Sequence, residues 1–166
     1  MITKEHINVD IRYLSDHEDV VPLLAAWIYD EWSYLYPGMT LHDVVSFFKE
    51  RVNKEKLPLT FVAFEAGEPV GTVSLKMFDM EARRDLPHWL TSLYVAEPWR
   101  RKGIGTGLLE TAEKKAVEMG ICRLFLLTTD ATIPGLSYSK SGWIVKEKTM
   151  YHSYPVTIME KDLCRK

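Results

Sequence analysis

The sequence predicts a mixed α/β fold built on one central sheet, and not a doubly wound parallel sheet. Seven segments have the patterns of strands and four have the patterns of helices. A doubly wound sheet alternates strand and helix along the whole chain. Here three predicted strands follow one another in the middle of the chain and two follow one another at its end, which favours antiparallel pairing there.

Length and composition predict a single domain spanning residues 1–166. The chain is 46% hydrophobic and 27% charged, with a formal net charge of −2, which is ordinary for a globular protein of this size. This charge balance predicts binding to neither nucleic acid nor a membrane surface. The polar start has no signal-peptide pattern, and no uncharged apolar run could span a bilayer, so we expect a cytoplasmic protein.

The cysteines and histidines predict neither a metal site nor a crosslink. No Cys/His cluster has the spacing of zinc ligands, so we expect no metal. The two cysteines, Cys122 and Cys164, lie in an apolar run and in a polar C-terminal tail. We therefore expect two free thiols in a reducing compartment, without a disulfide.

The first third of the chain predicts one strand and two helices. Residues 9–14 alternate apolar and polar side chains, as a half-buried strand does. Ser15 or Asp16 is a candidate cap for a helix that runs to about residue 32. Thr40 is a candidate cap for a second helix to about residue 52, because Thr40 and Asp43 have the spacing of a capping box.

The rest of the chain predicts six strands and two further helices around a charged loop at 79–87. The longer helix is expected over 103–119, with an apolar stripe on one face, and a short helix is expected at about 134–140. Strands are expected wherever β-formers are bounded by turn signals. These segments are 59–65, 69–77, 89–95, 123–128, 143–149 and 155–161.

The turn between the strand at 89–95 and the helix at 103–119 predicts a phosphate site. It holds three basic residues, 100–102, followed by glycines at 103, 105 and 107. The first turn of a helix has unpaired N–H groups and attracts anions, and glycine lets the backbone come close to them. The turn lacks the Gly-Lys-Ser/Thr ending of the Walker motif and the spacing of the dinucleotide fingerprint. We therefore expect a pyrophosphate to bind here.

Two motifs are similar to those of a known family. Arg100-x-x-Gly103-x-Gly105 resembles the Arg/Gln-x-x-Gly-x-Gly/Ala signature of the GNAT superfamily of N-acetyltransferases, and Tyr138-Ser-Lys140-Ser-Gly142-Trp143 resembles its Tyr-x-Lys-x-Gly-Phe motif. The resemblance is strong over 89–143, and the order of the predicted elements agrees over nearly the whole chain. It implies a mixed, mostly antiparallel sheet of about seven strands, flanked by about four helices. Two parallel strands, 89–95 and 123–128, would splay apart to bind CoA.

The resemblance also implies acetyl-CoA as cosubstrate and direct attack of a primary amine on its thioester in a ternary complex. Pantetheine would pair with the strand edge at Leu93, Tyr94 and Val95. The pyrophosphate would accept hydrogen bonds from backbone N–H groups of the signature turn. These belong to Arg100, Arg101, Lys102, Gly103, Ile104, Gly105 and Thr106.

The catalytic groups implied by the resemblance are few. Tyr138 would protonate the departing thiolate, and the backbone N–H of Leu93 or Tyr94 would stabilise the oxyanion. Some family members carry a general-base Glu where this chain has Thr91 and Ser92. The base remains open between a chain of water molecules and side chains chosen only by type, namely His88, Glu31 and Asp30. The sequence 129–131, Thr-Asp-Ala, replaces a family Asn that touches the cofactor arm.

The sequence leaves the acceptor amine open. Aromatic residues cluster in the first helices, at Trp27, Tyr29, Trp32, Tyr34 and Tyr36. With Asp30 and Glu31 they would suit a cationic amine, but the same pattern is typical of an amphipathic helix packed on a core. We favour a small-molecule amine as partner, because the chain has no accessory region for a protein substrate.

Three alternatives remain beside a small-molecule acetyltransferase. The chain could modify a protein N-terminus or a lysine, or it could be a non-catalytic acyl-CoA-binding module on the same fold. A homodimer is the default expectation for the oligomeric state.

Overall fold

The fold is a seven-stranded sheet of order β1-β2-β3-β4-β5-β7-β6. The computed structural model describes residues 9–129 and 136–165. All neighbouring strands pair antiparallel except β4 and β5, which pair parallel. This confirms the expected mixed, mostly antiparallel sheet. The strands are β1 (Val9–Tyr13), β2 (Leu59–Glu65), β3 (Glu68–Lys76), β4 (Trp89–Val95), β5 (Arg123–Thr128), β6 (Ile144–Tyr151) and β7 (Tyr154–Asp162).

Three α-helices occur in the described residues: α1 (Val21–Trp32), α2 (Leu41–Glu50) and α3 (Ile104–Glu118). The capping box predicted for α2 is confirmed, since the Thr40 hydroxyl accepts from the N–H of Asp43 and the Asp43 carboxylate accepts from the N–H of Thr40. The short helix expected at 134–140 falls partly outside the described residues. Its described part is the single 3-10 turn η6 (Ser139–Ser141).

The first helix begins later than predicted because of a proline. Two 3-10 turns, η1 (Leu14–Asp16) and η2 (Glu18–Val20), precede α1, and Pro22 lies in the first turn of that helix. A proline has no N–H to donate and its ring clashes with the carbonyl four residues before it. It is therefore tolerated in the first turn and not within a helix that starts at residue 16.

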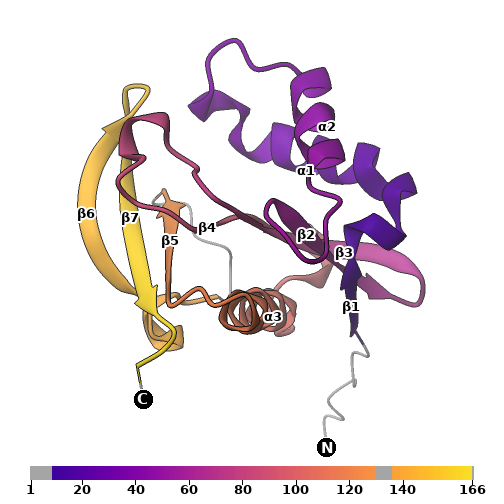
Figure 1. Cartoon of the computed structure of the whole chain (residues 1–166). Coiled ribbons are helices and arrows are strands. Elements are labelled where there is room, and N and C mark those ends of the chain that lie inside the picture. The colour runs from indigo at the N-terminus through magenta and orange to yellow at the C-terminus, as the bar shows by residue number, and fades with distance from the viewer. Residues whose placement is uncertain (1–8, 130–135, 166) are drawn as a thin grey trace, which may run out of the picture.

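The two faces of the sheet are covered by different helices, with α3 on one face and α1 and α2 on the other (Figure 1). Alternate residues of β2 enter the two cores: Phe61 packs in the core that contains α3, and Val62 packs with α1 and α2. Helix α3 lies close to β3, because a Cβ on Gly71 would come within 2.9 Å of the Leu108 side chain and of the Tyr94 carbonyl oxygen. Packing on both faces explains the weak polar alternation of the central strands.

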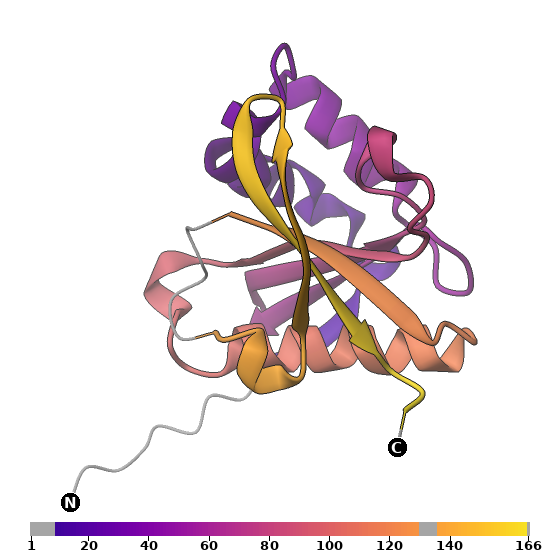
Figure 2. The same ribbon diagram turned by 90° about the vertical axis from the view of Figure 1, so that its left-hand side faces the viewer.

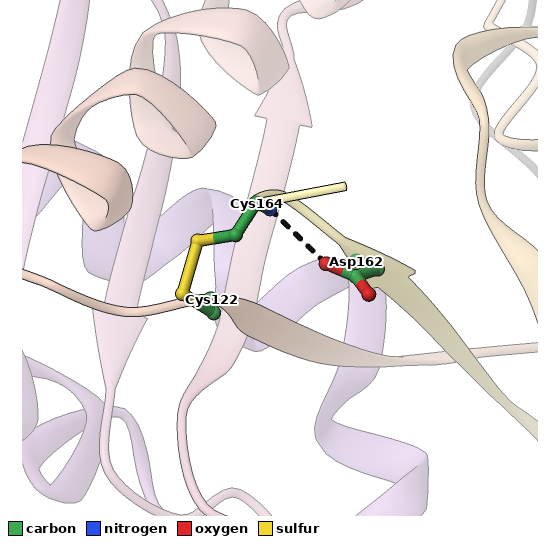
Figure 3. Close-up of a disulfide and its surroundings, with 3 residues drawn as sticks. All are labelled: Cys122, Asp162 and Cys164. Carbon is green, nitrogen blue, oxygen red and sulfur yellow. Dashed lines mark hydrogen bonds between the residues drawn. A yellow bond between two sulfur atoms is a disulfide. The ribbon is translucent and has the colours of Figure 1, made fainter. Parts of the chain in front are cut away.

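The two cysteines form a disulfide, so the prediction of free thiols is wrong (Figure 3). Strand β5 pairs antiparallel with β7, with Arg123 opposite Asp162. The N–H of Leu163 then donates to the carbonyl of Cys122 at 2.7 Å. This pairing brings the Cα atoms of Cys122 and Cys164 to 5.0 Å across 42 residues of sequence. The crosslink fixes the C-terminal tail to the junction between α3 and β5.

We predict that Cys164→Ser lowers the free energy of unfolding by about 2–4 kcal/mol, because the crosslink restricts the unfolded chain. Urea unfolding of protein purified without reductant measures the change. Reduction of the wild type should reproduce the loss and should have no effect on the variant. Two titratable thiols in the unreduced wild type would contradict the crosslink.

Candidate active site

The candidate site begins where β4 and β5 separate. The two parallel strands share a single register pair, Trp89 with Phe125, and the Phe125 N–H donates to the His88 carbonyl at 3.0 Å. Trp89 is fully buried and its indole N–H donates to the Leu86 carbonyl at 2.6 Å. The strands are thus joined at one end and diverge beyond it, and β5 continues its pairing with β7 instead (Figure 2).

A cavity of about 80 Å³, here called the cleft cavity, lies in this divergence. Its walls come from both strands, from α1 and the 3-10 turn η3 (Ser33–Leu35), and from the segment that leads into η6. The lining residues are Ile28, Trp32, Leu35, Tyr36, Asp79, Leu90, Thr91, Ser92, Leu93, Leu126, Leu127, Thr129 and Tyr138.

A β-bulge in β4 borders the cleft cavity. Thr72 pairs with Tyr94 and Ser74 pairs with Thr91, so that Ser92 and Leu93 together face one residue of β3. Ser92 has a φ of 54°, a left-handed conformation that is rare for a residue other than glycine. A bulge interrupts the ladder and leaves backbone groups without their regular partners. The regular pairing of β4 with β3 is thus interrupted at Leu93. The family resemblance implies that the N–H of Leu93 or of Tyr94 stabilises the oxyanion.

The predicted phosphate turn presents a series of backbone donors at the start of α3. The Arg100 N–H donates to the Glu97 carbonyl at 3.3 Å. Backbone N–H groups from Arg101 to Thr106 have no hydrogen-bond partner in the described part of the chain. Gly103 has a φ of 86° at the N-cap of the helix. These donors, with the positive end of the helix dipole, suit a pyrophosphate.

Tyr94 and Arg100 connect the turn to the first helix. The guanidinium Nε of Arg100 donates to the Val95 carbonyl at 2.8 Å, and its Cζ lies 5.4 Å from the centre of the Tyr94 ring. The Tyr94 ring stacks on Trp27 at 5.3 Å and meets the edge of Trp32 at 6.2 Å. Two members of the expected aromatic cluster, Trp27 and Trp32, thus pack against the strand end, and Trp32 also lines the cleft cavity.

Tyr138 lines the cleft cavity together with Ser92 and Leu93 of the bulge. Its carbonyl accepts from the N–H groups of Ser141 and Trp143, both at 3.0 Å, and its ring meets that of Trp143 edge to face. Lys161 donates to the Ser141 carbonyl at 2.6 Å and ties η6 to β7. Burial raises the pKa of the Tyr138 phenol to about 12. Lys140 is exposed.

A second cavity of about 200 Å³, here called the Arg51 cavity, adjoins the first. It shares with the cleft cavity the residues Ile28, Tyr36, Asp79, Thr91 and Ser92. Apolar side chains of α2 and of the segment before it, Met39, Val44, Phe47 and Phe48, form much of its wall. The combined lining of the two cavities extends from Tyr138 to Arg51 at the C-terminal end of α2.

Two buried charged residues face this space, and sequence reasoning identified neither. Arg51 is 8% exposed, and its Nη1 donates to the hydroxyls of Ser92 at 3.0 Å and Ser74 at 3.3 Å. Burial lowers the pKa of the Arg51 guanidinium. The Asp79 side chain is 8% exposed and pairs with Lys76 at 3.2 Å. Burial, reinforced by the Asp79 charge, raises the pKa of Tyr36.

The sequence carried a signal for Arg51 but none for Asp79. Val44, Phe48 and Arg51 are spaced four and three residues apart, which places them on one face of α2. A charge in phase with an apolar stripe is unusual and indicates a buried partner or ligand. Asp79 lies in a charged loop, where its burial depends on strands distant in sequence.

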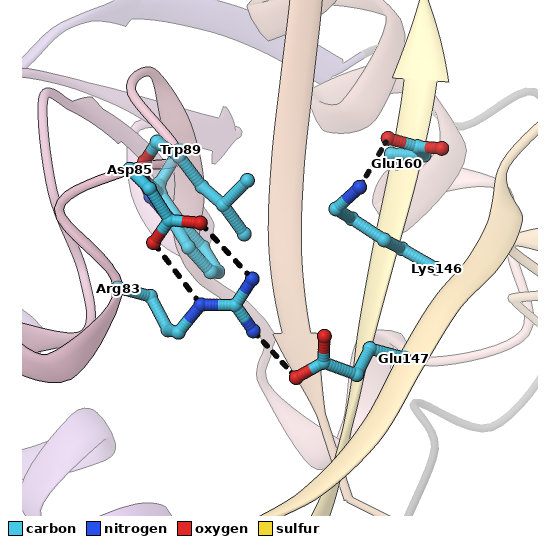
Figure 4. Close-up of polar contacts among 7 residues, drawn as sticks. Arg83, Asp85, Trp89, Lys146, Glu147 and Glu160 are labelled. Atoms are coloured by element: carbon cyan, nitrogen blue, oxygen red, sulfur yellow. Dashed lines mark hydrogen bonds and ion pairs between the residues drawn. The ribbon is translucent and has the colours of Figure 1, made fainter.

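The β6–β7 hairpin packs against the segment around η3, which contributes Leu35 and Tyr36 to the lining of the cleft cavity. At its tip, Tyr154 meets Tyr34 at 5.1 Å and Tyr151 meets Tyr36 at 5.5 Å, both edge to face. Arg83, in the loop before β4, pairs with Asp85 and with Glu147 of β6 (Figure 4). The Arg83 guanidinium lowers the pKa of the Asp85 carboxyl. These contacts hold the hairpin, the η3 segment and the loop that carries Asp79 together.

The structure places the three candidate general bases, Asp30, Glu31 and His88, outside both cavities. Asp30 and Glu31 are exposed and line neither cavity. His88 is half-buried just before β4 and also lies outside both cavities, and burial lowers its pKa. Of the 129–131 segment, Thr129 lines the cleft cavity, while Asp130 and Ala131 lie outside the described residues.

Two further properties follow from the part of the chain that the structure covers. In residues 9–129 and 136–165, His, Cys, Asp and Glu side chains form no group of three that could hold a metal ion. Over the same ranges, no helix has both the length and the apolar character to cross a membrane.

Comparison with known proteins shows the family to which the chain belongs. The model of the acetyltransferase (GNAT) family matches residues 22–138, which include β4, the glycine turn and Tyr138. The chain belongs to the GNAT family. It is therefore an acetyl-CoA-dependent N-acyltransferase, as the two sequence motifs predicted.

Relatives of this GNAT protein agree with that assignment. The N-alpha-acetyltransferase MAK3 of Arabidopsis thaliana is 29% identical over 144 residues, which cover 86% of this chain and 68% of that protein. An aminoglycoside 6'-N-acetyltransferase complexed with coenzyme A has a TM-score of 0.70 at 18% identity, over 95% of this chain and 98% of that one. The N-acetylglutamate synthase of Neisseria gonorrhoeae has a TM-score of 0.70 at 24% identity, over 99% of this chain and 37% of that one. The two structures show that the GNAT fold is shared.

We predict that Gly103→Ala weakens acetyl-CoA binding about tenfold or more, because a Cβ at a φ of 86° strains the turn that presents the N–H donors. Gly120→Ala is the matched control, since Gly120 has a φ of 80° just past the other end of α3 and also faces open space. Calorimetric titration with acetyl-CoA measures the affinities. Equal affinities in the two variants would contradict a role for this turn in binding.

Proposed function

We propose that this GNAT enzyme transfers the acetyl group of acetyl-CoA to the primary amine of a small molecule, by direct attack in a ternary complex. The observation that carries the proposal is the cleft cavity, which is lined by both the bulged strand β4 and the half-buried Tyr138. A thioester in this cleft would be reached from two directions. The pantetheine arm would enter between β4 and β5, and the amine would enter from the Arg51 cavity.

The proposed cosubstrate contacts use the donors that the fold leaves unpaired. Backbone N–H groups of Arg101 to Thr106 would hold the pyrophosphate, with Arg100 fixing the turn through Val95. The edge of β4 at Leu93, Tyr94 and Val95 would pair with the pantetheine amides, much as an added strand would. That edge has no strand partner beyond Trp89, because β5 has diverged.

The proposed reaction needs few side chains. The neutral amine attacks the thioester carbonyl, a C–N bond forms, and the tetrahedral oxyanion accepts a hydrogen bond from the N–H of Leu93 or Tyr94. The C–S bond then breaks, the phenol of Tyr138 gives its proton to the departing thiolate, and the amine proton passes to water. Holding the two reactants together supplies much of the rate enhancement, with effective molarities of about 10⁵ M or more.

The size of the Arg51 cavity favours a small molecule over a peptide as the acceptor. The contacts of Tyr34 with Tyr154 and of Tyr36 with Tyr151 bridge the hairpin tip and the η3 segment. The Arg51 cavity has a volume of about 200 Å³, which fits a small amine better than an extended chain. The similarity to the MAK3 enzyme favours a second candidate, acetylation of a protein N-terminus.

We predict that Tyr138→Phe lowers kcat about 100-fold or more, because the thiolate loses its proton donor. The phenol is protonated below its pKa of about 12 and loses the proton only as the pH rises through that value. The wild-type rate should therefore rise as the acceptor amine is deprotonated and show no falling limb below about pH 11. Thiol release from acetyl-CoA, measured from pH 6 to 10.5, checks both effects.

Tyr29→Phe is the control for this experiment, since Tyr29 lies on α1 and lines neither cavity. An equal loss in both variants, or no loss in Tyr138→Phe, would contradict the acid role.

The acceptor class is tested by competition. Small primary amines should support thiol release, and peptides with free N-termini should neither be acetylated nor inhibit. Acetylation of peptides with a higher kcat/KM than any small amine would select the second candidate. Binding of acetyl-CoA without release by any acceptor would instead favour a non-catalytic binding module.

A further inference from the structure

The charge balance of the Arg51 cavity has one unmatched cation. Among the described residues, Asp79 pairs with Lys76, and Arg51 forms no ion pair with any carboxylate. Within the described residues, the Arg51 guanidinium contacts two serine hydroxyls, both through Nη1, and the face of the Phe48 ring at 5.0 Å. The charge of Asp79 also stabilises the guanidinium, without an ion pair between the two side chains. Buried charges are costly unless they are paired.

The free nitrogens of Arg51 do not lie unsatisfied within the packed core. The buried side-chain nitrogens and oxygens that lack a partner in the described residues do not include any atom of Arg51. Its hydrogen bonds use Nη1 alone, and the residue lines the Arg51 cavity. Arg51 also lines a neighbouring cavity of about 310 Å³, on whose wall Leu57 and Phe78 lie. The remaining donors therefore reach the space of these two cavities, and the Arg51 cavity is the one that adjoins the cleft cavity. A guanidinium presents them in a planar fork that matches the two oxygens of a carboxylate.

We infer that the acceptor is an amino carboxylate with an apolar body, whose carboxylate binds Arg51. This inference rests on the proposed function and names its substrate class. The apolar wall, formed by Met39, Val44, Phe47 and Phe48, would take the body of the molecule.

The contact between Arg51 and the bulge indicates how far apart the carboxylate and the amine of the acceptor would lie. Arg51 Nη1 lies 3.0 Å from the hydroxyl of Ser92, and Ser92 directly precedes Leu93, where we place the oxyanion donor. Arg51 and the proposed oxyanion donor thus border the same bulge, which favours an acceptor whose carboxylate lies close to its amine. An α- or β-amino acid has this arrangement, and an amide or a peptide N-terminus lacks the charge.

The test compares matched acceptors on the full-length protein. A series of α- and β-amino acids with apolar side chains is assayed by thiol release, each beside its own carboxamide and beside a dipeptide that begins with it. The free acids should have kcat/KM values about 10- to 100-fold above those of the amides, which is the effect of one charged hydrogen-bonded pair. Equal values for acids and amides would overturn the inference while leaving the acetyltransferase intact.

Variants of the pocket separate ligand binding from support of the bulge. Arg51→Gln should reduce the acid-to-amide ratio of kcat/KM to near one, mainly through KM for the acid. Ser92→Ala removes the hydroxyl but keeps the guanidinium, and should preserve the ratio. Arg12→Gln, on an exposed arginine of β1, is the matched control. A parallel fall for acids and amides in Arg51→Gln, with an unchanged ratio, would mean a structural role only.

A measurement on the wild type keeps the inference testable if Arg51→Gln does not fold. Carboxylates without an amine, such as propionate and 3-phenylpropionate, should compete with the amino acid acceptor, and their amides should not. Absence of such competition would overturn the inference. If no amine of any class releases thiol although acetyl-CoA binds, the proposed function itself fails, which is a distinguishable result.

Discussion

The divergence of β4 and β5 is the constraint on which the rest of the site depends. The strands are joined at Trp89 and Phe125, and the buried Trp89 indole anchors that joint to the loop before it. Beyond it each strand has another partner, β3 or β7, so the sheet stays continuous while its centre opens. The opening exposes a strand edge inside the protein. Both cavities and the helix α3 N-terminus lie around it.

Two polar side chains line the opening, the half-buried Tyr138 and the buried Arg51. Tyr138 stands on the side of β5, held by Trp143 and by the tie from Lys161 to its turn. Arg51 stands on the other side of the bulge and contacts it through Ser92. The strained backbone of the bulge thus lies in contact with Arg51, and it lines the same cavity as Tyr138, the proposed proton donor. Backbone strain of this kind is concentrated at functional sites because the surrounding packing maintains it.

The region where we propose that the acceptor binds is assembled from segments far apart in the chain. The hairpin tip contacts η3, and Arg83 joins the loop before β4 to β6. None of these contacts lies between residues close in sequence, which is why sequence reasoning chose Asp30 and Glu31 and not Asp79. The same reason explains the missed disulfide. Cys122 and Cys164 come together only because β7 lies beside β5, although each sits next to a predicted strand.

The sequence by itself determined the elements whose signals are local. The capping box at Thr40, the strand at 89–95, the glycine turn and the long helix after it depend on neighbouring residues, and all were predicted. The two motifs also predicted the GNAT family. Only the tertiary structure decided which strands diverge, which charges become buried and which segments the tip of the β6–β7 hairpin contacts. Those properties depend on strand order and on contacts across the sheet, which no local pattern encodes.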